Sequence, residues 1–272
     1  MRIITLLTDF GHKDPYVAEM KGVIYSINPK ALIVDITHDV KRHDVHEAAY
    51  ILLAAYKYFP KGSIHVVVVD PGVGTHRRAI VIESKNYIFV GPDNGVLLPA
   101  STKDGIIAIR EIKNPILLRK RITSTFHGRD VFVPVAAYLS LGVKCEHVGP
   151  PIPIDEVVTL FLPKAEIEGS TFRATVIHVD VFGNVITNVE ESQIRDRMHR
   201  GSLVEICIKR TGKRITLPFL ETYGSVKEGK GLLLINSEGY LEIAINRGNA
   251  SREYGIQRGD ELILKPSPSV TA

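Results

Sequence analysis

Residues 65–78 read HVVVVDPGVGTHRR, and this stretch decides the fold. Four consecutive valines lead to Asp70, and a proline, two glycines and two adjacent arginines follow at once. A continuous apolar run bounded by turn residues is typical of a parallel strand that is covered on both faces. We therefore predict a central strand of an α/β sheet, with Asp70 at its carboxyl end and a tight loop carrying Arg77 behind it.

The sequence on either side of this strand alternates strand-like and helix-like segments. RIITLLTD (residues 2–9) and ALIVDIT (31–37) predict two further strands, the second of them buried. Asp14 is predicted to cap a helix that has Pro15 at its first position. Asp44 and Glu47 have capping-box spacing at the start of a second helix, which Pro60 and Gly62 end.

The segments after the valine run indicate that the sheet also contains antiparallel strands. RAIVIES (78–84) and YIFVGPDNG (87–95) have no helix between them, so they predict a hairpin and hence a mixed sheet. A further helix is expected within residues 129–142, closed by Gly142.

A composition break occurs at GPPIPIDEVV, around Pro150, and from about Lys164 the sequence reads as short strands joined by turns. We expect an N-terminal α/β sandwich domain with a mixed sheet at residues 1–150 and a linker at residues 151–163. A smaller, mainly β, barrel-like domain should follow at residues 164–272.

Composition narrows the classes of function. The formal charge is +4 with scattered basic residues, which disfavours a nucleic-acid binder. Cys145 and Cys207 have no CxxC spacing, and HDVHE (43–47) matches no common metal motif, so neither a disulfide nor a metal is expected. No apolar stretch approaches the roughly 20 residues of a membrane span. We expect a cytoplasmic protein without membrane or nucleic-acid partners.

Three acids stand where predicted strands end: Asp9, Asp70 and Asp93. Ligands of open α/β sheets bind beyond the carboxyl ends of the strands, so the three predict a site there, although each could simply form a turn. The glycine-rich loop lacks the GxxxxGK[ST] pattern of a phosphate loop. Arg77 can fold back to Asp70 and keep it ionised. His127, in STFHGRD, lies on a polar loop before a helix and can project into the same cleft.

Together these stretches resemble the S-adenosylmethionine hydroxide adenosyltransferases, relatives of the enzymes that fluorinate and chlorinate the same substrate. The resemblance rests on TDFGHKDPYVAEMKGVIYSINP, DPGVGTHRR, PDNG, STFHGRD, DVFGNVITN and NSEGYLEIAINRGNA. They occur in order from residue 8 to residue 250, and the set is specific although each piece alone is short.

The resemblance implies a homotrimer whose active sites lie where the N-terminal domain of one subunit meets the C-terminal domain of a neighbour. It implies hydrolysis of S-adenosylmethionine (SAM), without a cofactor, to adenosine and methionine by attack of water at the ribose C5′. An Asp/Arg/His triad handles the water in this family, and Asp70, Arg77 and His127 occupy its positions. Whether Asp70, His127 or a relay through both takes the proton stays open.

The resemblance also implies substrate contacts. Asp9 matches the acid that binds the ribose hydroxyls, and Asn184 matches the residue that reads the adenine edge. Asp180 and Ser237 match the groups that hold the methionine ammonium and carboxylate. Phe182 and Tyr223 are candidate stacking walls for the base, although core packing is the favoured interpretation for a lone aromatic residue in a β domain. Glu242 is a candidate polar contact.

Departures from the halogenating relatives favour a hydrolase. Fluorinating enzymes carry an aromatic residue where Asp70 stands, a serine where Gly128 stands and a long insertion where SKN (84–86) joins two strands here. Chlorinating relatives also have glycine at the position of Gly128, so Asp70 is the stronger indication. Tyr16 replaces a small polar residue near the methionine end. The alternatives are a halogenase, a SAM or adenosine sensor without turnover, and an oligomeric scaffold.

Overall fold

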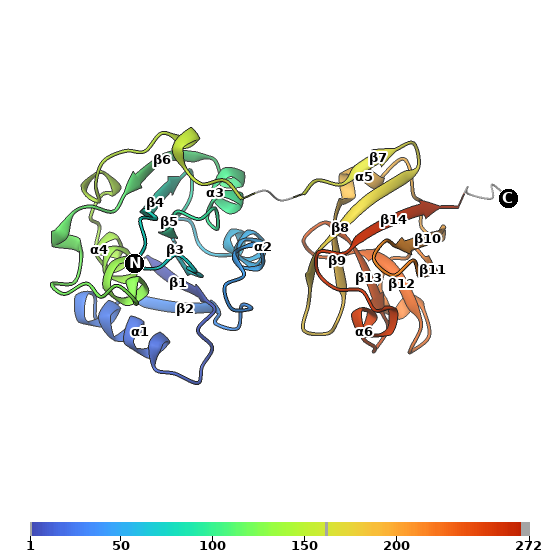
Figure 1. The fold of residues 1–272 in the computed structure, drawn as a ribbon, viewed down its shortest axis with the longest axis horizontal. Coiled ribbons are helices and arrows are strands. Elements are labelled where there is room, and N and C mark those ends of the chain that lie inside the picture. The colour runs from blue at the N-terminus through green and yellow to red at the C-terminus, as the bar shows by residue number, and fades with distance from the viewer. Residues whose placement is uncertain (1, 161–162, 268–272) are drawn as a thin grey trace. The chain divides into compact units, whose positions relative to one another are not determined.

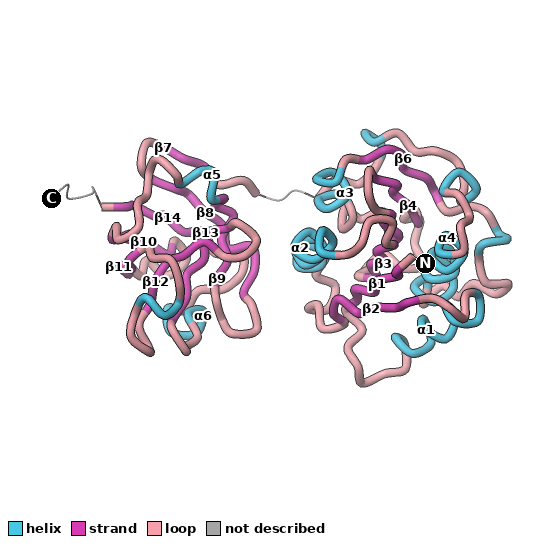
Figure 2. The backbone as a smooth tube through the Cα atoms, turned by 180° about the vertical axis from the view of Figure 1, so that it is seen from behind, coloured by secondary structure: helices cyan, strands magenta, loops and turns pink. Residues whose placement is uncertain are grey.

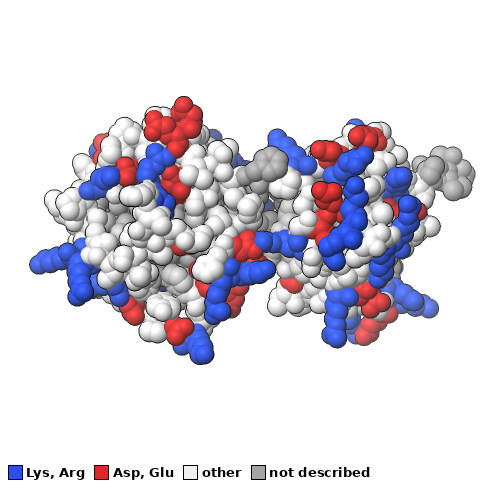
Figure 3. All heavy atoms as spheres, viewed as in Figure 1, with Lys and Arg blue, Asp and Glu red and all other residues white. Residues whose placement is uncertain are grey.

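The computed structural model describes residues 2–160 and 163–267. The chain forms two compact units, Met1–Phe161 and Leu162–Ala272 (Figure 1). Within the described residues, no helix has the length and apolar character required to cross a membrane. On the face shown in Figure 3, basic and acidic side chains are interspersed on both units.

The first unit alternates strands with helices and short helical turns. Its elements are β1 (Ile3–Thr8), α1 (Tyr16–Ile27), β2 (Leu32–Thr37), α2 (Val45–Ala55), η1 (Tyr56–Tyr58), β3 (Ile64–Val68), β4 (Ala79–Ser84), β5 (Ile88–Pro92), α3 (Leu98–Asp104), β6 (Ile106–Glu111), η2 (Pro115–Leu117), η3 (Gly128–Phe132), α4 (Val133–Ser140), η4 (Cys145–His147) and η5 (Ile154–Glu156).

Six strands of this unit form one sheet in the order β2-β1-β3-β5-β4-β6. The strands β2, β1, β3 and β5 are parallel, whereas β4 pairs antiparallel with both β5 and β6. The predicted hairpin and mixed sheet are confirmed. Helices α1 and α4 cover one face of the sheet, and α2 and α3 cover the other (Figures 1 and 2).

The valine run explains why β3 lies inside this sandwich. Val66 and Val68 pack in the cluster that contains α1 and α4, while Val67 and Val69 pack in the cluster that contains α2 and α3. Because side chains alternate between the faces of a strand, only a strand covered on both sides places four successive valines in apolar surroundings.

Two local predictions are wrong. The strand β2 is not buried: it lies at the edge of the sheet, where Leu32 is 50% and Val34 is 39% exposed. Asp14 does not cap α1, because the helix starts one residue later than predicted. Pro15 stands at the N-cap, and its carbonyl accepts the amide of Glu19.

The segment after Pro150 packs against the first unit. Pro151 forms an isolated bridge with Arg110, and Ile152 and Val157 are buried among side chains of α2, α3 and the central strands. Sequence patterns do not show this docking, because prolines mark the segment as irregular without indicating what it touches.

The second unit is built almost wholly from antiparallel strands. Its elements are β7 (Glu166–Glu168), β8 (Thr171–Val179), β9 (Val185–Glu190), α5 (Glu191–Ile194), β10 (Leu203–Ile208), β11 (Arg214–Pro218), η6 (Tyr223–Ser225), β12 (Gly231–Ile235), β13 (Tyr240–Ile245), α6 (Ala250–Tyr254) and β14 (Glu261–Pro266).

Its sheet curls into a nearly closed barrel. The strand order is β11-β10-β14-β8-β9-β13-β12, with β7 paired to β8. A bridge between Phe219 and Leu233 links the two ends of this order. The predicted fold class, a mixed α/β unit followed by a barrel-like β unit, is confirmed.

Candidate active site

The loop behind β3 brings Arg77 back to Asp70, as predicted. Arg77 Nε donates to both carboxylate oxygens of Asp70, at 2.9 and 3.0 Å, and its Nη2 also donates to Oδ2. The side chains of Asp70 and Arg77 are only 5% and 10% exposed. A two-nitrogen contact fixes the plane of the Asp70 carboxylate in this sheltered position.

Gly74 allows this loop to lie against the segment that carries His127. Its φ is +76°, and a Cβ there would collide with the carbonyl oxygen of Ser124. Only glycine meets both requirements without strain. The sequence shows the glycine but not its neighbour, which is 50 residues further along.

His127 completes the cluster through Arg77. Arg77 Nη2 lies 2.7 Å from His127 Nδ1. Since arginine has only donors, Nδ1 must accept, and the neutral imidazole therefore carries its proton on Nε2. Burial, and next the charge of Arg77, lower the pKa of His127, which keeps the ring neutral near pH 7.

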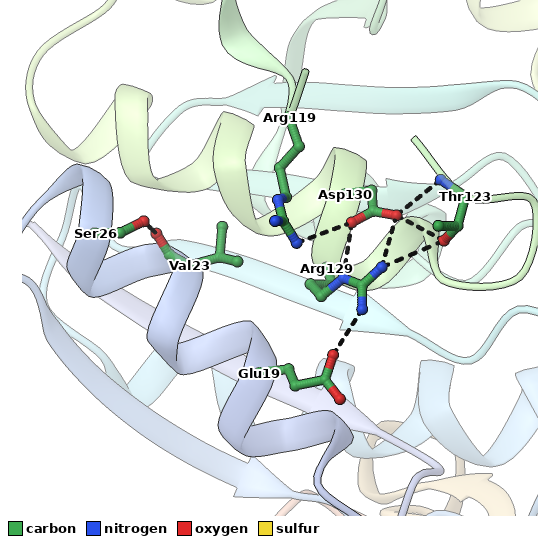
Figure 4. Close-up of polar contacts among 7 residues, drawn as sticks. All are labelled: Glu19, Val23, Ser26, Arg119, Thr123, Arg129 and Asp130. Carbon is green, nitrogen blue, oxygen red and sulfur yellow. Dashed lines mark hydrogen bonds and ion pairs between the residues drawn. The ribbon is translucent and has the colours of Figure 1, made fainter. Parts of the chain in front are cut away.

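An ion-pair network holds the segment around His127 (Figure 4). Asp130 is fully buried and accepts from Arg129, from Arg119 and from both the amide and the hydroxyl of Thr123. Burial alone would raise the pKa of Asp130, but these hydrogen bonds outweigh it and lower the pKa to about 2. Arg129 also donates to Glu19 of α1, so the network fastens this segment to a helix.

The network occupies the turn at which His127 leads into η3, a single π-helical turn. Turns of this kind are frequent at functional sites. Arg129 and Asp130 lie within the quoted motif STFHGRD, and Glu19 lies within TDFGHKDPYVAEMKGVIYSINP, whereas Thr123 lies outside every quoted motif.

Asp9 stands one residue beyond β1 and is oriented by the backbone. Its Oδ2 accepts the amide of His43 at 2.8 Å, and the amide of Gly11 donates to the carbonyl of His38. His43 has a φ of 65°, a strained conformation for a residue with a side chain. The loop after β2 therefore holds the loop that carries Asp9.

Asp93 has a different environment from Asp9 and Asp70. It is 3% exposed, with Oδ2 bound by Arg78 and Oδ1 by the amide of Val158. Oδ1 thus binds the segment after Pro150 directly, and Oδ2 binds Arg78, whose guanidinium also donates to the carbonyl of Glu156 in that segment.

In the second unit, Asp180 and Asn184 form one turn between β8 and β9. Asp180 Oδ1 accepts the amides of Phe182 and Asn184, and Oδ2 accepts the side-chain amide of Asn184 at 2.9 Å. Phe182 is 72% exposed and Val181 is 91% exposed at its tip. Core packing of Phe182 is therefore wrong, and an apolar surface is left for a ligand or partner.

Glu242 and Tyr223 lie in the same region of the barrel. The Tyr223 hydroxyl donates to Glu242 Oε1 at 2.8 Å, and Glu242 is 3% exposed. Burial first, and the nearby charge of Asp180, raise the pKa of Glu242. Tyr223 is 42% exposed, so core packing is wrong for it as well.

Ser237 is exposed and donates to Glu238 at 3.3 Å. It lies in the turn before β13, next to Asn236, which also hydrogen-bonds Glu242.

In the described part of the chain, no three His, Cys, Asp or Glu side chains are grouped so as to hold a metal ion.

The chain is similar to known proteins along nearly its whole length. Residues 4–149 match the SAM hydroxide adenosyltransferase N-terminal domain, and residues 174–263 match the C-terminal domain of the same family. A protein named (R)-S-adenosyl-L-methionine hydrolase, from Salinispora tropica, is 37% identical over 260 residues, which are 95% of this chain and 96% of that protein.

Two further proteins are similar to this chain, one at lower and one at higher sequence identity. A fluorinase from an Actinoplanes species is 26% identical over 284 residues, covering 94% of this chain and 95% of its own. A crystal structure of an uncharacterized conserved protein from Thermotoga maritima has a TM-score of 0.92 and 39% identity, and covers 97% of this chain and 100% of its own. With both domains matched and hydrolases more similar than the fluorinase, the chain belongs to the SAM hydroxide adenosyltransferase family.

Proposed function

We propose that the protein hydrolyses SAM to adenosine and methionine, with water as the nucleophile at the ribose C5′. The relatives named as SAM hydrolases, 37–38% identical over 95–96% of the chain, support the reaction. The observation that carries the mechanism is the contact of Arg77 with both Asp70 and His127.

The reaction balances without a redox step. A C5′–O bond forms as the C5′–S bond breaks, and the sulfonium sulfur takes the electron pair and leaves as the neutral thioether of methionine. One proton is lost from the attacking water. Because the sulfonium is already an excellent leaving group, the enzyme needs to align the water and accept that proton.

Asp70 is the acceptor that the geometry favours. In its neutral form His127 turns Nδ1 toward Arg77 and has its proton on Nε2, so it can donate a hydrogen bond to the water but cannot take its proton. The Asp70 carboxylate retains lone pairs beyond those that accept from Arg77. The proposal therefore gives positioning to His127 and proton removal to Asp70.

The substrate contacts are assigned by chemical type. Asp9 is a two-oxygen acceptor suited to two ribose hydroxyls, and Asn184 is suited to the adenine edge. Asp180 supplies negative charge for the methionine ammonium, with Ser237 for its carboxylate. Phe182 and Tyr223 provide exposed rings for stacking, and Glu242 acts by holding the Tyr223 hydroxyl.

We further propose a homotrimer in which neighbouring subunits complete each site, because the assigned residues divide between the two units of the chain. Asp70→Ala and Asp180→Ala variants should each be inactive alone. Mixed after partial denaturation and refolding, they should recover part of the activity, since some interfaces then carry both intact residues. No recovery, despite mixed trimers by native mass spectrometry, would place each site within one subunit.

The experiment that tests the reaction is incubation of the purified protein with SAM in ¹⁸O-water with chloride present, read by mass spectrometry. Adenosine labelled at the 5′ oxygen, together with methionine, is expected. A 5′-chloro product would establish a halogenase instead. Tight retention of the nucleoside without turnover would establish a sensor.

Asp70→Ala tests the assigned base in the same assay. Turnover should fall by at least about a thousandfold, while adenosine affinity stays within about threefold, because the carboxylate acts on water rather than on the nucleoside. Asp155→Ala, at an exposed carboxylate of the same unit, is the matched control. Unchanged turnover in Asp70→Ala would refute the triad assignment.

A further inference from the structure

A chain of polar contacts runs from Asp35, an exposed residue of β2, through the buried His38 to Thr8, the residue before Asp9. Asp35 Oδ1 lies 3.0 Å from His38 Nε2, and His38 Nδ1 lies 2.8 Å from Thr8 Oγ1. Thr8 Oγ1 in turn accepts the amide of Phe10 at 3.3 Å. Thr8 and His38 are 0% and 1% exposed, so water does not compete for the contact between them, whereas the Asp35 side chain is 33% exposed.

The chemistry of these groups decides which atom is the donor and which is the acceptor in each contact. The Asp35 carboxylate can only accept, so the proton of a neutral His38 belongs on Nε2. Nδ1 is then an acceptor, which makes Thr8 the donor and leaves its oxygen to receive the amide of Phe10. Burial lowers the pKa of His38, which favours this neutral form, although Asp35 opposes the shift. The charged and titratable groups around the ring are Asp35, Lys21 and His12.

The chain ends on both sides of Asp9. Thr8 precedes Asp9, and Phe10 follows it. The carbonyl of His38 also accepts the amide of Gly11, and His43, five residues after His38, gives its amide to Asp9 Oδ2. The loop at residues 38–43 thus contacts this segment at the Thr8 side chain, at the Gly11 amide and at the Asp9 carboxylate.

Phe10, the last residue of this chain of contacts, also packs on the aromatic residue that precedes His127. The Phe10 ring packs on the rings of Tyr16 and Phe126, each at 5.6 Å. A change in the backbone at Phe10 would therefore be felt both at Asp9 and next to the proposed triad. Asp35, His38 and Thr8 are not themselves assigned to the substrate or to the water.

We propose that His38, with Asp35 and Thr8, is a positioning device that fixes the Asp9 carboxylate for recognition of a vicinal ribose diol. This rests on the proposed function, in which Asp9 accepts from the ribose hydroxyls. A carboxylate can accept from both hydroxyls of one ribose only if its plane and its distance from the ring are fixed. If the loop were looser, one of the two hydrogen bonds would be lost. The device therefore governs discrimination between ribose and 2′-deoxyribose.

The test compares adenosine with 2′-deoxyadenosine by isothermal titration, alongside SAM kinetics. Thr8→Val keeps the shape of the side chain and removes the hydroxyl. It should lower the ratio of the two affinities at least fivefold and raise KM for SAM about tenfold, with kcat within threefold. Thr8→Ser, which restores the hydroxyl, should keep the ratio of the unmodified protein. Lys21→Met removes only the outer ion pair of Asp35 and should change the ratio less than twofold.

Asp9→Asn separates a failure of this inference from a failure of the Asp9 assignment. If Asp9→Asn leaves the affinity ratio unchanged, Asp9 does not bind the ribose and both ideas fall. If Asp9→Asn collapses the ratio and Thr8→Val does not, the assignment stands and the positioning role is overturned. A Thr8→Val protein with a lower melting temperature, a uniformly lower kcat and an unchanged ratio would likewise overturn it, because it would show a purely structural role.

Discussion

Arg77 joins the two side chains that are proposed to act on the water, Asp70 and His127. Its Nε and Nη2 hold the Asp70 carboxylate, and the same Nη2 also reaches the His127 ring. Its guanidinium lies over the Phe132 ring as well, at 5.2 Å. A planar group that cannot lose its proton is suited to set both the orientation of the Asp70 carboxylate and the tautomer of His127.

Arg77→Lys should reveal this double role. An ammonium keeps the charge but cannot present two parallel donors to Asp70 and a third contact to His127. We expect kcat to fall by about a hundredfold or more, with adenosine affinity within about threefold. Steady-state kinetics and titration of adenosine measure the two. A kcat equal to that of the unmodified protein would show that charge alone suffices.

At the scale of elements, the active loop depends on the close packing of two connections. The loop at 70–78 follows β3, and the segment at 123–127 precedes η3, and they meet where Gly74 faces Ser124. The strand β3 itself is fixed by apolar packing on both faces, so the loop starts from a rigid point.

Gly74→Ala should damage both stability and turnover. The methyl group meets the Ser124 carbonyl, and the backbone is in the left-handed region, so we expect a loss of on the order of 2 kcal/mol or more in unfolding free energy. We expect kcat to fall more than tenfold because Arg77 is displaced. Urea denaturation and kinetics measure these effects.

Gly62→Ala is the matched control. Gly62 also has a positive φ, of +85°, but open space surrounds the added methyl group. It should show the conformational penalty alone, about 1 kcal/mol, with normal kcat. Equal effects of the two substitutions would mean that the contact with Ser124 does not matter.

At the scale of the whole molecule, the residues of the proposed site come from both units. The α/β unit supplies the residues proposed to act on water, and the β unit supplies Asp180, Asn184 and the exposed rings.

Stability of the first unit should depend on pH through His65, which is fully buried in β3 beside Tyr56, Tyr87 and Phe89. Burial lowers the pKa of His65 to about 4.

This shift predicts acid destabilisation in a defined window. Above the ordinary pKa of 6.5 the ring is neutral in both the folded and unfolded chain, and its contribution does not change with pH. As pH falls from about 6.5 to about 4, only the unfolded chain takes up the proton, so stability should fall by roughly 3 kcal/mol. Below the folded pKa no further loss comes from this ring.

His65→Phe removes the titration while keeping an aromatic ring in the cluster. Its unfolding free energy should depend less on pH between about 7 and 4.5 than that of the unmodified protein, by about 2 to 3 kcal/mol. His147→Asn, at an exposed histidine, should leave the pH dependence unchanged. Parallel pH curves for all three proteins would assign the acid sensitivity to other groups. Hydrogen exchange of the β3 amides locates the change in this unit.

Patterns along the chain were sufficient for much of the fold. The valine run predicted a strand buried on both faces, the missing helix between residues 84 and 87 predicted the hairpin, and Asp44 caps α2 as expected. These features depend on residues close together in sequence, whose burial and hydrogen bonds follow from local periodicity. The position of Asp70 at a strand end and the return of Arg77 are of this kind.

The tertiary structure decided the features that depend on distant partners. ALIVDIT resembles a buried strand, but its edge position in the sheet, which local sequence does not encode, exposes Leu32 and Val34. Asp93 resembles Asp70 until Arg78 and Val158 are seen to occupy both its oxygens. Likewise, the contact of Gly74 with Ser124 and the chain from Asp35 to Thr8 exist only when segments 30 or more positions apart meet. The sequence by itself thus determined which residue types stand at the strand ends, and the folded chain decided which of them bind one another, because a hydrogen bond depends on distance in space and not along the chain.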